Sequence, residues 1–448
     1  MSNSDTNKQH APQKRLDDAG LLPRPESITN KIKLLTLSDH PLSPSGVGTQ
    51  TRYIIEALLE TGKFEVHSFG GAMKHQDYSV TKTERWGDKW IIHPVDGYGT
   101  PDMIRSFIDH EKPDMMWFMT DPRFWGWLWE LDNEIRPAMP MIYYHVWDNY
   151  PLPKYNKLFY DSNDFIATIS KVTDDIVKKV APDVESEYVP HAVNSEIFRK
   201  ITDPGVIEKF REESLGSDHD EKVIFLWNNR NARRKQSGTL IWWFKEFLDK
   251  VGHDKAVLIM HTDVRDAHGQ DLEAIVNELG LSDGQVMFST TKVDPEILSM
   301  MYNLADCTLN ISDAEGFGLA TLESLSCETP IIVNMTGGLQ EQVTDGKEWF
   351  GIGLEPTSKS VIGSLEVPYI YEDRISKEDF IGALTEIYNM SKEERQELGR
   401  KGRDHVLKNY NFKDFQEKWV NLMFRLHEEH GSWGTRKKYK NIYQGKVL

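Results

Sequence analysis

The sequence predicts an α/β protein made of two units, each built on a parallel β-sheet. Short apolar runs of strand length alternate with helical patterns and glycine-containing loops along most of the chain, which is the order of elements in such a sheet. The alternation stops in a polar stretch at 199–220 and then starts again. A length of 448 residues also favours two domains over one.

The first unit begins with the order strand, loop, helix, strand. The loop at 38–48 is rich in turn residues and contains Gly46 and Gly48. The expected elements are the strand 33–37, helix 49–59, strands 64–69 and 90–93, helix 101–110, strand 113–119, helix 124–134, strands 141–146 and 165–169, helix 171–180, and a last strand with its exit loop at 187–198. We interpret that exit loop as mainly structural, with His191 as its one candidate for a cleft residue.

The second unit repeats the alternation. The expected elements are the strand 222–227, helix 238–251, strand 256–260, helix 271–279, strand 286–288, helix 295–304, strand 307–311, and the helices 377–389, 392–409 and 412–430. The tail at 431–448 carries five Lys or Arg and no acid, and we interpret it as a solvated basic end.

Composition narrows the class of protein. The net charge of −17 argues against a surface that binds nucleic acid or anionic membranes over its whole extent. The two cysteines, Cys307 and Cys327, fit a reducing compartment and offer no disulfide framework. Residues 1–29 lack the apolar core of a signal peptide, and we interpret them as a flexible tail. No run approaches the roughly 20 apolar residues of a membrane helix. We therefore expect a soluble cytoplasmic protein, either free or peripheral to a membrane.

The stretch 310–334 carries the strongest functional pattern. Two strand-like runs flank a turn and a short helix, and Glu315 directly precedes Gly316-Phe317-Gly318. Glycines let a backbone approach a ligand closely, and a helix that starts near Gly318 offers free N–H groups to a phosphate. Glu323 is expected in the second turn of that helix. The pattern predicts a phosphate-bearing ligand held at two further points by carboxylates.

On these residues the chain resembles the retaining glycosyltransferases of the GT-B fold in family GT4, also called glycosyl transferases group 1. The motif is Glu-Gly-Phe-Gly-Leu-x-x-Leu-Glu at 315–323, followed by Pro-Ile-Ile-Val at 330–333, and the resemblance covers most of 31–430. It implies two Rossmann-like domains that face each other across a cleft. Their expected bounds are 30–198 for the N-terminal acceptor-side domain, 199–411 for the nucleotide-sugar-binding domain, and 412–430 for a C-terminal helix that crosses back to the first domain.

The resemblance implies the donor-binding residues. Arg230 and Lys235 match two cations that the family carries five residues apart, and fixed cations stabilise the charge that develops on a diphosphate leaving group. Glu315 is expected to bind the sugar hydroxyls and Glu323 the ribose diol, because a carboxylate accepts two hydrogen bonds at once. The other donor ligands implied are Gly46, Gly48, Thr291, Val293, Gly316, Phe317, Gly318 and Leu319.

The loop after the strand 141–146 belongs to the acceptor side. Many relatives place a histidine here that faces the reacting sugar, and this chain has Trp147 at that position. His145 lies two residues earlier on the same side of an extended strand, so it either replaces that histidine or packs within the sheet. Asp148 keeps the family's aspartate, and Trp147, Asp121 and Arg123 are the expected acceptor contacts. The catalytic set implied in this way is Arg230, Lys235, Glu315, Asp148 and His145.

The resemblance thus implies retaining transfer of a sugar from a UDP-, GDP- or ADP-sugar to a hydroxyl acceptor, which can be a glycan, a lipid or a small molecule. It implies no cofactor and no metal. Two alternatives stay open at this point. One is a glycosyltransferase that acts on modified nucleic-acid bases, and the other is a non-catalytic protein that binds nucleotide sugars or glycans. The retained Glu315, Arg230 and Lys235 argue against the second.

Overall fold

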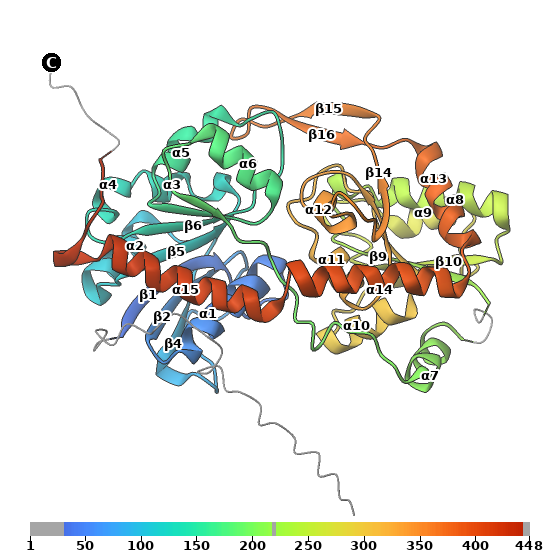
Figure 1. Ribbon diagram of the computed structural model, residues 1–448, viewed down its shortest axis with the longest axis horizontal. Helices are drawn as coiled ribbons and strands as arrows, with labels where there is room; N and C mark the ends of the chain where they lie inside the picture. Colours follow the sequence, from blue (N-terminus) through green and yellow to red (C-terminus); the bar gives the residue numbers. More distant parts are fainter. Residues whose placement is uncertain (1–30, 217–220, 442–448) are drawn as a thin grey trace, which may run out of the picture.

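The computed structural model describes residues 31–216 and 221–441. The predicted tail at 1–29 and the end of the basic tail, 442–448, lie outside the described residues. Figure 1 shows two α/β halves side by side, with the last two long helices running across both. Each half has its own sheet, as the sequence predicts. Every helix in 31–216 and 221–441 is too short or too polar to cross a membrane.

The first sheet has eight strands in the order β3-β4-β2-β1-β5-β6-β7-β8, and all neighbours are parallel except β3 and β4. Its central strands are buried, because helices cover both faces of the sheet. The strands are β1 (Ile32–Asp39), β2 (Phe64–Gly71), β3 (Thr81–Lys82), β4 (Trp90–Pro94), β5 (Met115–Thr120), β6 (Met141–His145), β7 (Phe165–Thr168) and β8 (Ser186–Tyr188). The helices are α1 (Gly46–Glu60), α2 (Pro101–Glu111), α3 (Gly126–Trp129), α4 (Asp132–Ile135), α5 (Lys157–Asp161) and α6 (Lys171–Val180).

Helix α1 begins at Gly46, three residues earlier than expected. Ser45 caps the helix, since its Oγ accepts a hydrogen bond from the backbone N–H of Gly48 at 2.9 Å. Gly46 and Gly48 therefore belong to the first turn of α1 rather than to a loop before it.

The prediction of a single helix at 124–134 is wrong. The chain forms two short turns instead, α3 and α4, with a break after Trp129. Trp129 stacks on Phe159 and donates a hydrogen bond from Nε1 to Asn163 at 3.1 Å. Burial of large aromatic side chains decides the backbone path here, and this outweighs the propensity for one continuous helix.

The second sheet has six parallel strands in the order β11-β10-β9-β12-β13-β14. The strands are β9 (Val223–Asn228), β10 (Ala256–His261), β11 (Val286–Ser289), β12 (Cys307–Asn310), β13 (Ile331–Asn334) and β14 (Gly351–Leu354). The helices are α8 (Ser237–Val251), α9 (Leu272–Glu278), α10 (Pro295–Leu304), α11 (Leu319–Ser326), α12 (Leu339–Val343), α13 (Lys377–Asn389) and α14 (Lys392–Asn409). The polar stretch at 199–220 contains a further helix, α7 (Pro204–Leu215), that was not predicted and that buries no residue.

The last helix, α15 (Phe412–His430), returns to the first half and packs on α1, as expected. Trp419 of this helix is fully buried, with ring centroids 5.9 Å from Trp117 and 4.8 Å from Tyr144. Helix α14 packs on α11 in the second half, so the α14–α15 run joins the two cores.

A β-hairpin that was not predicted also joins the halves. Its strands are β15 (Ser358–Ile362) and β16 (Ile370–Arg374), and Figure 1 shows it bridging from the second half to the first. The backbone N–H of Tyr371 donates to the carbonyl of Tyr150 at 2.6 Å, and Asn149 donates to the carbonyl of Tyr371 at 2.9 Å. Val367 at its tip is buried in the core of the first half.

Candidate active site

A cavity of about 810 Å³ lies between the two halves, at the carboxyl ends of both sheets. Open α/β sheets bind ligands at this edge, and the volume is in the range of small-molecule sites. The hairpin β15–β16 forms part of its wall. The predicted site residues that line it are Gly46, Asp121, Arg123, Trp147, Asp148, Arg230, Lys235, Glu315, Gly316, Phe317, Gly318 and Leu319.

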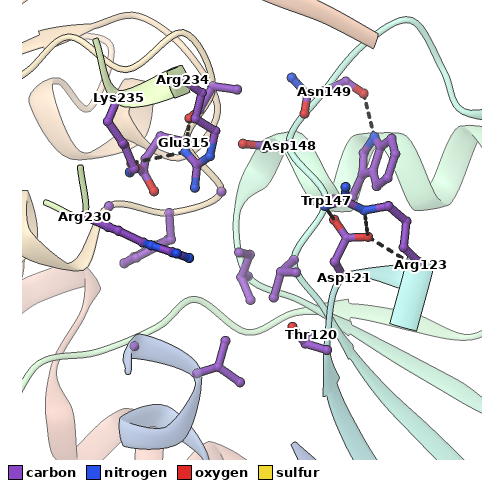
Figure 2. A pocket seen from close by; sticks show the side chains of 18 of the residues that line it. Thr120, Asp121, Arg123, Trp147, Asp148, Asn149, Arg230, Arg234, Lys235 and Glu315 are labelled. Atoms are coloured by element: carbon purple, nitrogen blue, oxygen red, sulfur yellow. Dashed lines mark hydrogen bonds and ion pairs between the residues drawn. The ribbon is translucent and has the colours of Figure 1, made fainter. Parts of the chain in front are cut away.

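A buried ion pair lies in the wall of this cavity. The ammonium of Lys235 donates to the carboxylate of Glu315, and the two residues are only 7% and 9% exposed. Arg234 donates to the carbonyl of Ala314, and its Nη1 lies 3.9 Å from the same carboxylate. Figure 2 shows Asp148 on the opposite wall, pointing toward this group.

The charges of this group shift one another's protonation. Burial raises the pKa of Asp148 to about 7, with Arg234 opposing the rise and Glu315 adding to it. Burial also acts to raise the pKa of Glu315, but Lys235 and Arg234 hold it below its usual value. Burial and the neighbouring Arg234 lower the pKa of Lys235 to about 8. Of these two facing carboxylates, Glu315 is held in its ionised form and Asp148 titrates near neutral pH.

Arg230 lies at the exposed rim, and Figure 2 shows it extending toward the cavity. Its Nε and Nη2 donate to the carboxylate of Asp266 at 2.6 and 3.0 Å, and Nη2 lies 2.8 Å from Nδ1 of His268. Hydrogen bonds from Arg230 hold the pKa of Asp266 well below its usual range. Part of the charge that Arg230 brings to the cavity is therefore offset by Asp266.

The glycine turn before α11 needs its glycine. Gly318 has a φ of +90°, and a Cβ there would lie 2.6 Å from Cδ2 of Leu339. Gly46 faces this turn from the first half, since a Cβ on it would lie 2.9 Å from Cδ1 of Leu319. The first turns of α1 and α11 therefore meet at the cavity, where both offer backbone N–H groups.

Five predicted site residues do not line the cavity: Gly48, His145, Thr291, Val293 and Glu323. His145 is fully buried in the sheet, with its ring nitrogens 3.0 and 2.8 Å from the hydroxyls of Tyr143 and Tyr160. Burial lowers the pKa of His145 to about 3. Of the two alternatives for His145, the structure shows the histidine packed within the sheet.

The other four also lie outside the cavity lining. Glu323 sits in the second turn of α11 as predicted, where it accepts a hydrogen bond from the Tyr302 hydroxyl at 2.8 Å, and burial raises its pKa to about 7. Gly48 is needed for packing, since a Cβ there would lie 2.6 Å from the carbonyl oxygen of His40. Thr291 is exposed and Val293 half-buried in the loop after β11.

Among the cavity residues of the first half that escaped prediction, Asp39 is the one with a carboxylate. Asp39 ends β1 and accepts hydrogen bonds from the Tyr98 hydroxyl at 2.8 Å and from Ser45 at 2.7 Å. Its position at the carboxyl end of a strand was the available signal. His191, the cleft candidate of the otherwise structural exit loop, does line the cavity, and its ring meets Phe317 edge to face at 5.2 Å.

The hairpin contributes further unpredicted residues to the wall. Glu372 of β16 is 2% exposed and accepts two hydrogen bonds from Arg233, at 2.6 and 2.9 Å. This pairing holds Arg233, which also lines the cavity, against the hairpin, whereas Arg234 and Lys235 reach the carboxylate of Glu315.

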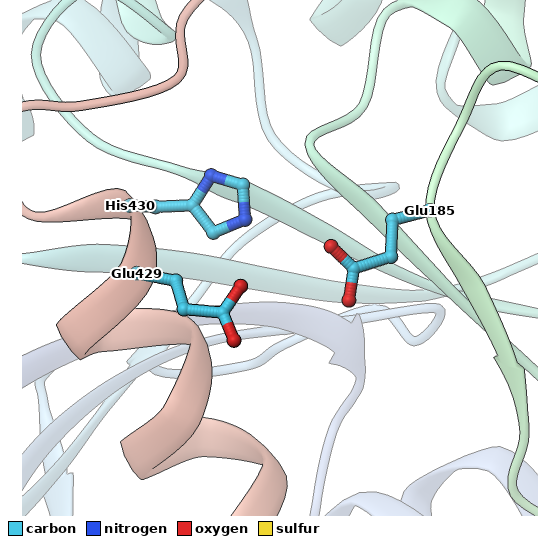
Figure 3. A group of neighbouring side chains, drawn as sticks. All are labelled: Glu185, Glu429 and His430. Atoms are coloured by element: carbon cyan, nitrogen blue, oxygen red, sulfur yellow. The ribbon is translucent and has the colours of Figure 1, made fainter.

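A group with metal-ligand chemistry lies elsewhere in the described residues. Glu185, Glu429 and His430 place ligand atoms within 4.8 Å of one another near the end of α15 (Figure 3). Both carboxylates already pair with cations: Arg425 contacts Glu185 at 2.5 Å, and Lys438 contacts Glu429 at 2.6 Å. The group is an ion-pair network in this structure.

Comparisons with known proteins agree with this geometry. Residues 208–405 match the family model of glycosyl transferases group 1. A D-inositol 3-phosphate glycosyltransferase of Corynebacterium jeikeium is 34% identical over 143 residues, which are 31% of this chain and 33% of that protein. The chain aligns with a third or less of the length of the first curated relatives.

Solved structures match over nearly the whole chain. Sucrose-phosphate synthase from Thermosynechococcus elongatus superposes with a TM-score of 0.69 at 18% identity, covering 89% of this chain and 99% of that one. An E. coli trehalose-6-phosphate structure bound with UDP-2-fluoro glucose gives 0.65 at 11% identity, covering 88% and 98%. At these identities the likeness concerns the fold, which is the two-domain GT-B fold.

Proposed function

Residues 208–405 of this GT-B chain belong to the glycosyl transferases group 1, and from this premise we propose that the protein transfers a sugar from a nucleotide diphosphate sugar to a hydroxyl acceptor. We propose further that the transfer retains the anomeric configuration of the donor. The observation that carries the proposal is the buried Lys235–Glu315 pair in the cavity wall, next to the first turn of α11.

The donor diphosphate is assigned to the cationic wall. Lys235 and Arg234 are held near the glycine turn, Arg230 extends from the rim, and the first turns of α1 and α11 add backbone N–H groups. These fixed donors stabilise the negative charge that develops on the leaving phosphate, and they do so without reorganising during the reaction. We propose that they do this without a metal ion.

The sugar of the donor is assigned to the space between Glu315 and Asp148. An ionised Glu315 accepts hydrogen bonds from sugar hydroxyls, and Lys235 keeps it ionised. Asp148 faces it from the first half, where its raised pKa lets it act as either donor or acceptor of a hydrogen bond near pH 7.

The chemical step needs no covalent nucleophile from the protein. The bond between the anomeric carbon and the phosphate oxygen breaks, and the acceptor oxygen bonds to that carbon on the same face. The acceptor proton passes to the leaving phosphate oxygen, which becomes a better base as the bond breaks. The role of the chain is to position the two substrates and stabilise charge.

Acceptor binding is assigned to the first half. Asp121, Arg123 and Trp147 line the cavity there, and Arg123 is held by Asp121 at 2.9 and 3.1 Å. Glu323 remains the proposed ribose ligand, for which it has to exchange the Tyr302 hydroxyl for the ribose diol.

A ligand-binding panel tests the donor assignment. A ligand that binds only the folded state stabilises it by about 2.7 kcal/mol at a concentration of a hundred times Kd. We expect UDP, GDP or ADP, or one of their sugars, to raise the melting temperature of the wild type and not of Lys235→Ala. The UDP compounds come first, since a structure of the same fold binds UDP-2-fluoro glucose. If none of these nucleotides shifts the melting temperature, the proposal is wrong.

A further inference from the structure

Helix α12 touches both the donor-side turn and the opposite half of the molecule. It follows the loop after β13, and the backbone N–H of Gly338 at its start donates to the carbonyl of Glu315 at 3.1 Å. Gln342 donates to the carbonyl of Phe317 at 2.6 Å and accepts from Thr321 at 2.7 Å. The helix is thus fixed by hydrogen bonds both to the glycine turn and to α11.

Glu341 on the same helix reaches across to the first half. Its Oε2 accepts a hydrogen bond from the backbone N–H of Lys171, the first residue of α6, at 2.6 Å. Its Oε1 accepts from the hydroxyl of Tyr188 at the end of β8. The residue is only 6% exposed. A buried carboxylate of the second half is therefore held by two donors of the first half. One of these donors is a backbone N–H at a helix start, which has no acceptor within its own helix.

The junction between α14 and α15 also contacts Glu341. The Tyr410 hydroxyl, between these helices, lies 3.0 Å from the carbonyl oxygen of Glu341 and 3.3 Å from its Oε1. Nε2 of His405 lies 2.9 Å from that carbonyl oxygen, and Lys418 of α15 donates to the carbonyl of Tyr188. Three segments that are far apart in the sequence meet at one carboxylate.

We propose that Glu341 is a positioning residue that latches the two halves together and so sets the distance between the glycine turn and the first half. Separating the halves at this point leaves a buried carboxylate without two of its donors, and an unsatisfied charged group is expensive to expose or to leave buried unpaired. Because α12 is fixed to the Glu315 turn, the latch acts on the donor site without touching a substrate.

Small-angle scattering tests the latch without any ligand. The variants are Tyr188→Phe, which removes one donor, and Glu341→Gln, which replaces an acceptor oxygen by an NH₂ group. Glu348→Gln makes the same change at an exposed position of the same half and is the control. We expect wild type and control to share a radius of gyration near the roughly 22 Å of a compact chain of this length. Both latch variants should give a larger radius.

A larger radius in folded Tyr188→Phe, with near-ultraviolet circular dichroism like that of the wild type, supports the latch. An unchanged radius in that variant overturns it. Should Glu341→Gln fail to fold, Tyr188→Phe alone decides by the same criterion.

A second measurement links the latch to the donor site, and this link rests on the proposed function. Calorimetry with UDP should show about tenfold weaker binding in each latch variant, which is the loss of one hydrogen bond to a charged group. The affinity loss in the double variant should be smaller than the product of the two single-variant losses, because both residues take part in the same hydrogen bond. If UDP does not bind any variant or the wild type while the radius still rises, the latch stands and the proposed donor is wrong.

Discussion

Lys235 donates a hydrogen bond to Glu315 across 80 positions of sequence, and this pair closes the wall of the cavity between the two halves. Lys235 comes from the loop after β9 and Glu315 from the turn after β12, which are neighbouring strands of the second sheet. Because parallel strands end at the same edge, the two charges are brought together by the topology itself.

Removing the cation should impair both turnover and stability. We expect Lys235→Ala to lower kcat by about a hundredfold, since a fixed charge at the leaving group is lost. The free energy of unfolding should fall by about 3 kcal/mol, because Glu315 stays buried without its partner. Lys245→Ala, which breaks the i,i+4 pair of Lys245 with Asp249, should cost under about 1 kcal/mol and leave kcat unchanged. Near wild-type turnover in Lys235→Ala contradicts the assignment.

Substitution of Arg230 should lower turnover, whereas substitution of its partner Asp266 should not. Arg230→Ala removes a cation from the cavity and should lower kcat by about a hundredfold. Asp266→Asn removes the charge that competes for that cation and should keep turnover close to wild type. Steady-state kinetics of both variants checks this. Equal losses in the two would mean that Arg230 acts only through its pair with Asp266.

Nucleotide affinity should depend on pH through Glu323. Its pKa is raised to about 7, and only the ionised carboxylate accepts both hydroxyls of a ribose diol. Affinity should therefore rise as pH increases from 6 to 8, by up to about tenfold per pH unit below the pKa. Calorimetry on Glu323→Gln should show a weaker affinity, and the pH dependence that remains should come from the nucleotide's own phosphates and from Asp148 and Lys235. An identical pH profile in wild type and variant removes Glu323 from the ribose site.

The glycine turn should not tolerate a side chain. Gly318→Ala puts a Cβ at a φ of +90° and 2.6 Å from Leu339, so it should destabilise the protein by about 1–3 kcal/mol. Gly382→Ala is the matched control, because this glycine lies within α13 with open space around it. Alanine there should stabilise by up to about 1 kcal/mol. Denaturant unfolding of both variants gives the comparison.

The alternating pattern was enough to predict most of the fold. Strands such as β5 are buried on both faces and read as unbroken apolar runs, which is why they were found. The hairpin β15–β16 was missed because Ser358–Ile362 is largely polar and exposed, and because its partners lie in the other half of the molecule. The break between α3 and α4 depends on tertiary packing of Trp129, which no local pattern records.

The site was predicted in part, mainly from the resemblance to the glycosyltransferase family. Glu315, Lys235 and Asp148 follow the ends of strands, so their meeting at the cavity follows from the parallel sheets. Their pairing, and the raised pKa of Asp148, depend on burial that sequence spacing does not give. His145 and His191 show most clearly how far the sequence predicts which side chains line the cavity. The histidine considered for catalysis packs in the sheet, and the one in the exit loop lines the cavity.

One measurement tests the central claim most directly: the release of nucleoside diphosphate from UDP-, GDP- and ADP-sugars, followed by nuclear magnetic resonance of the anomeric proton of the product. We expect the wild type to release nucleoside diphosphate from one donor, to form a product with the donor's anomeric configuration, and to lose this activity in Lys235→Ala. Folded wild-type protein that releases nucleoside diphosphate from none of these donors, with or without hydroxyl acceptors, would contradict the claim, and a product of inverted configuration would contradict the retaining mechanism.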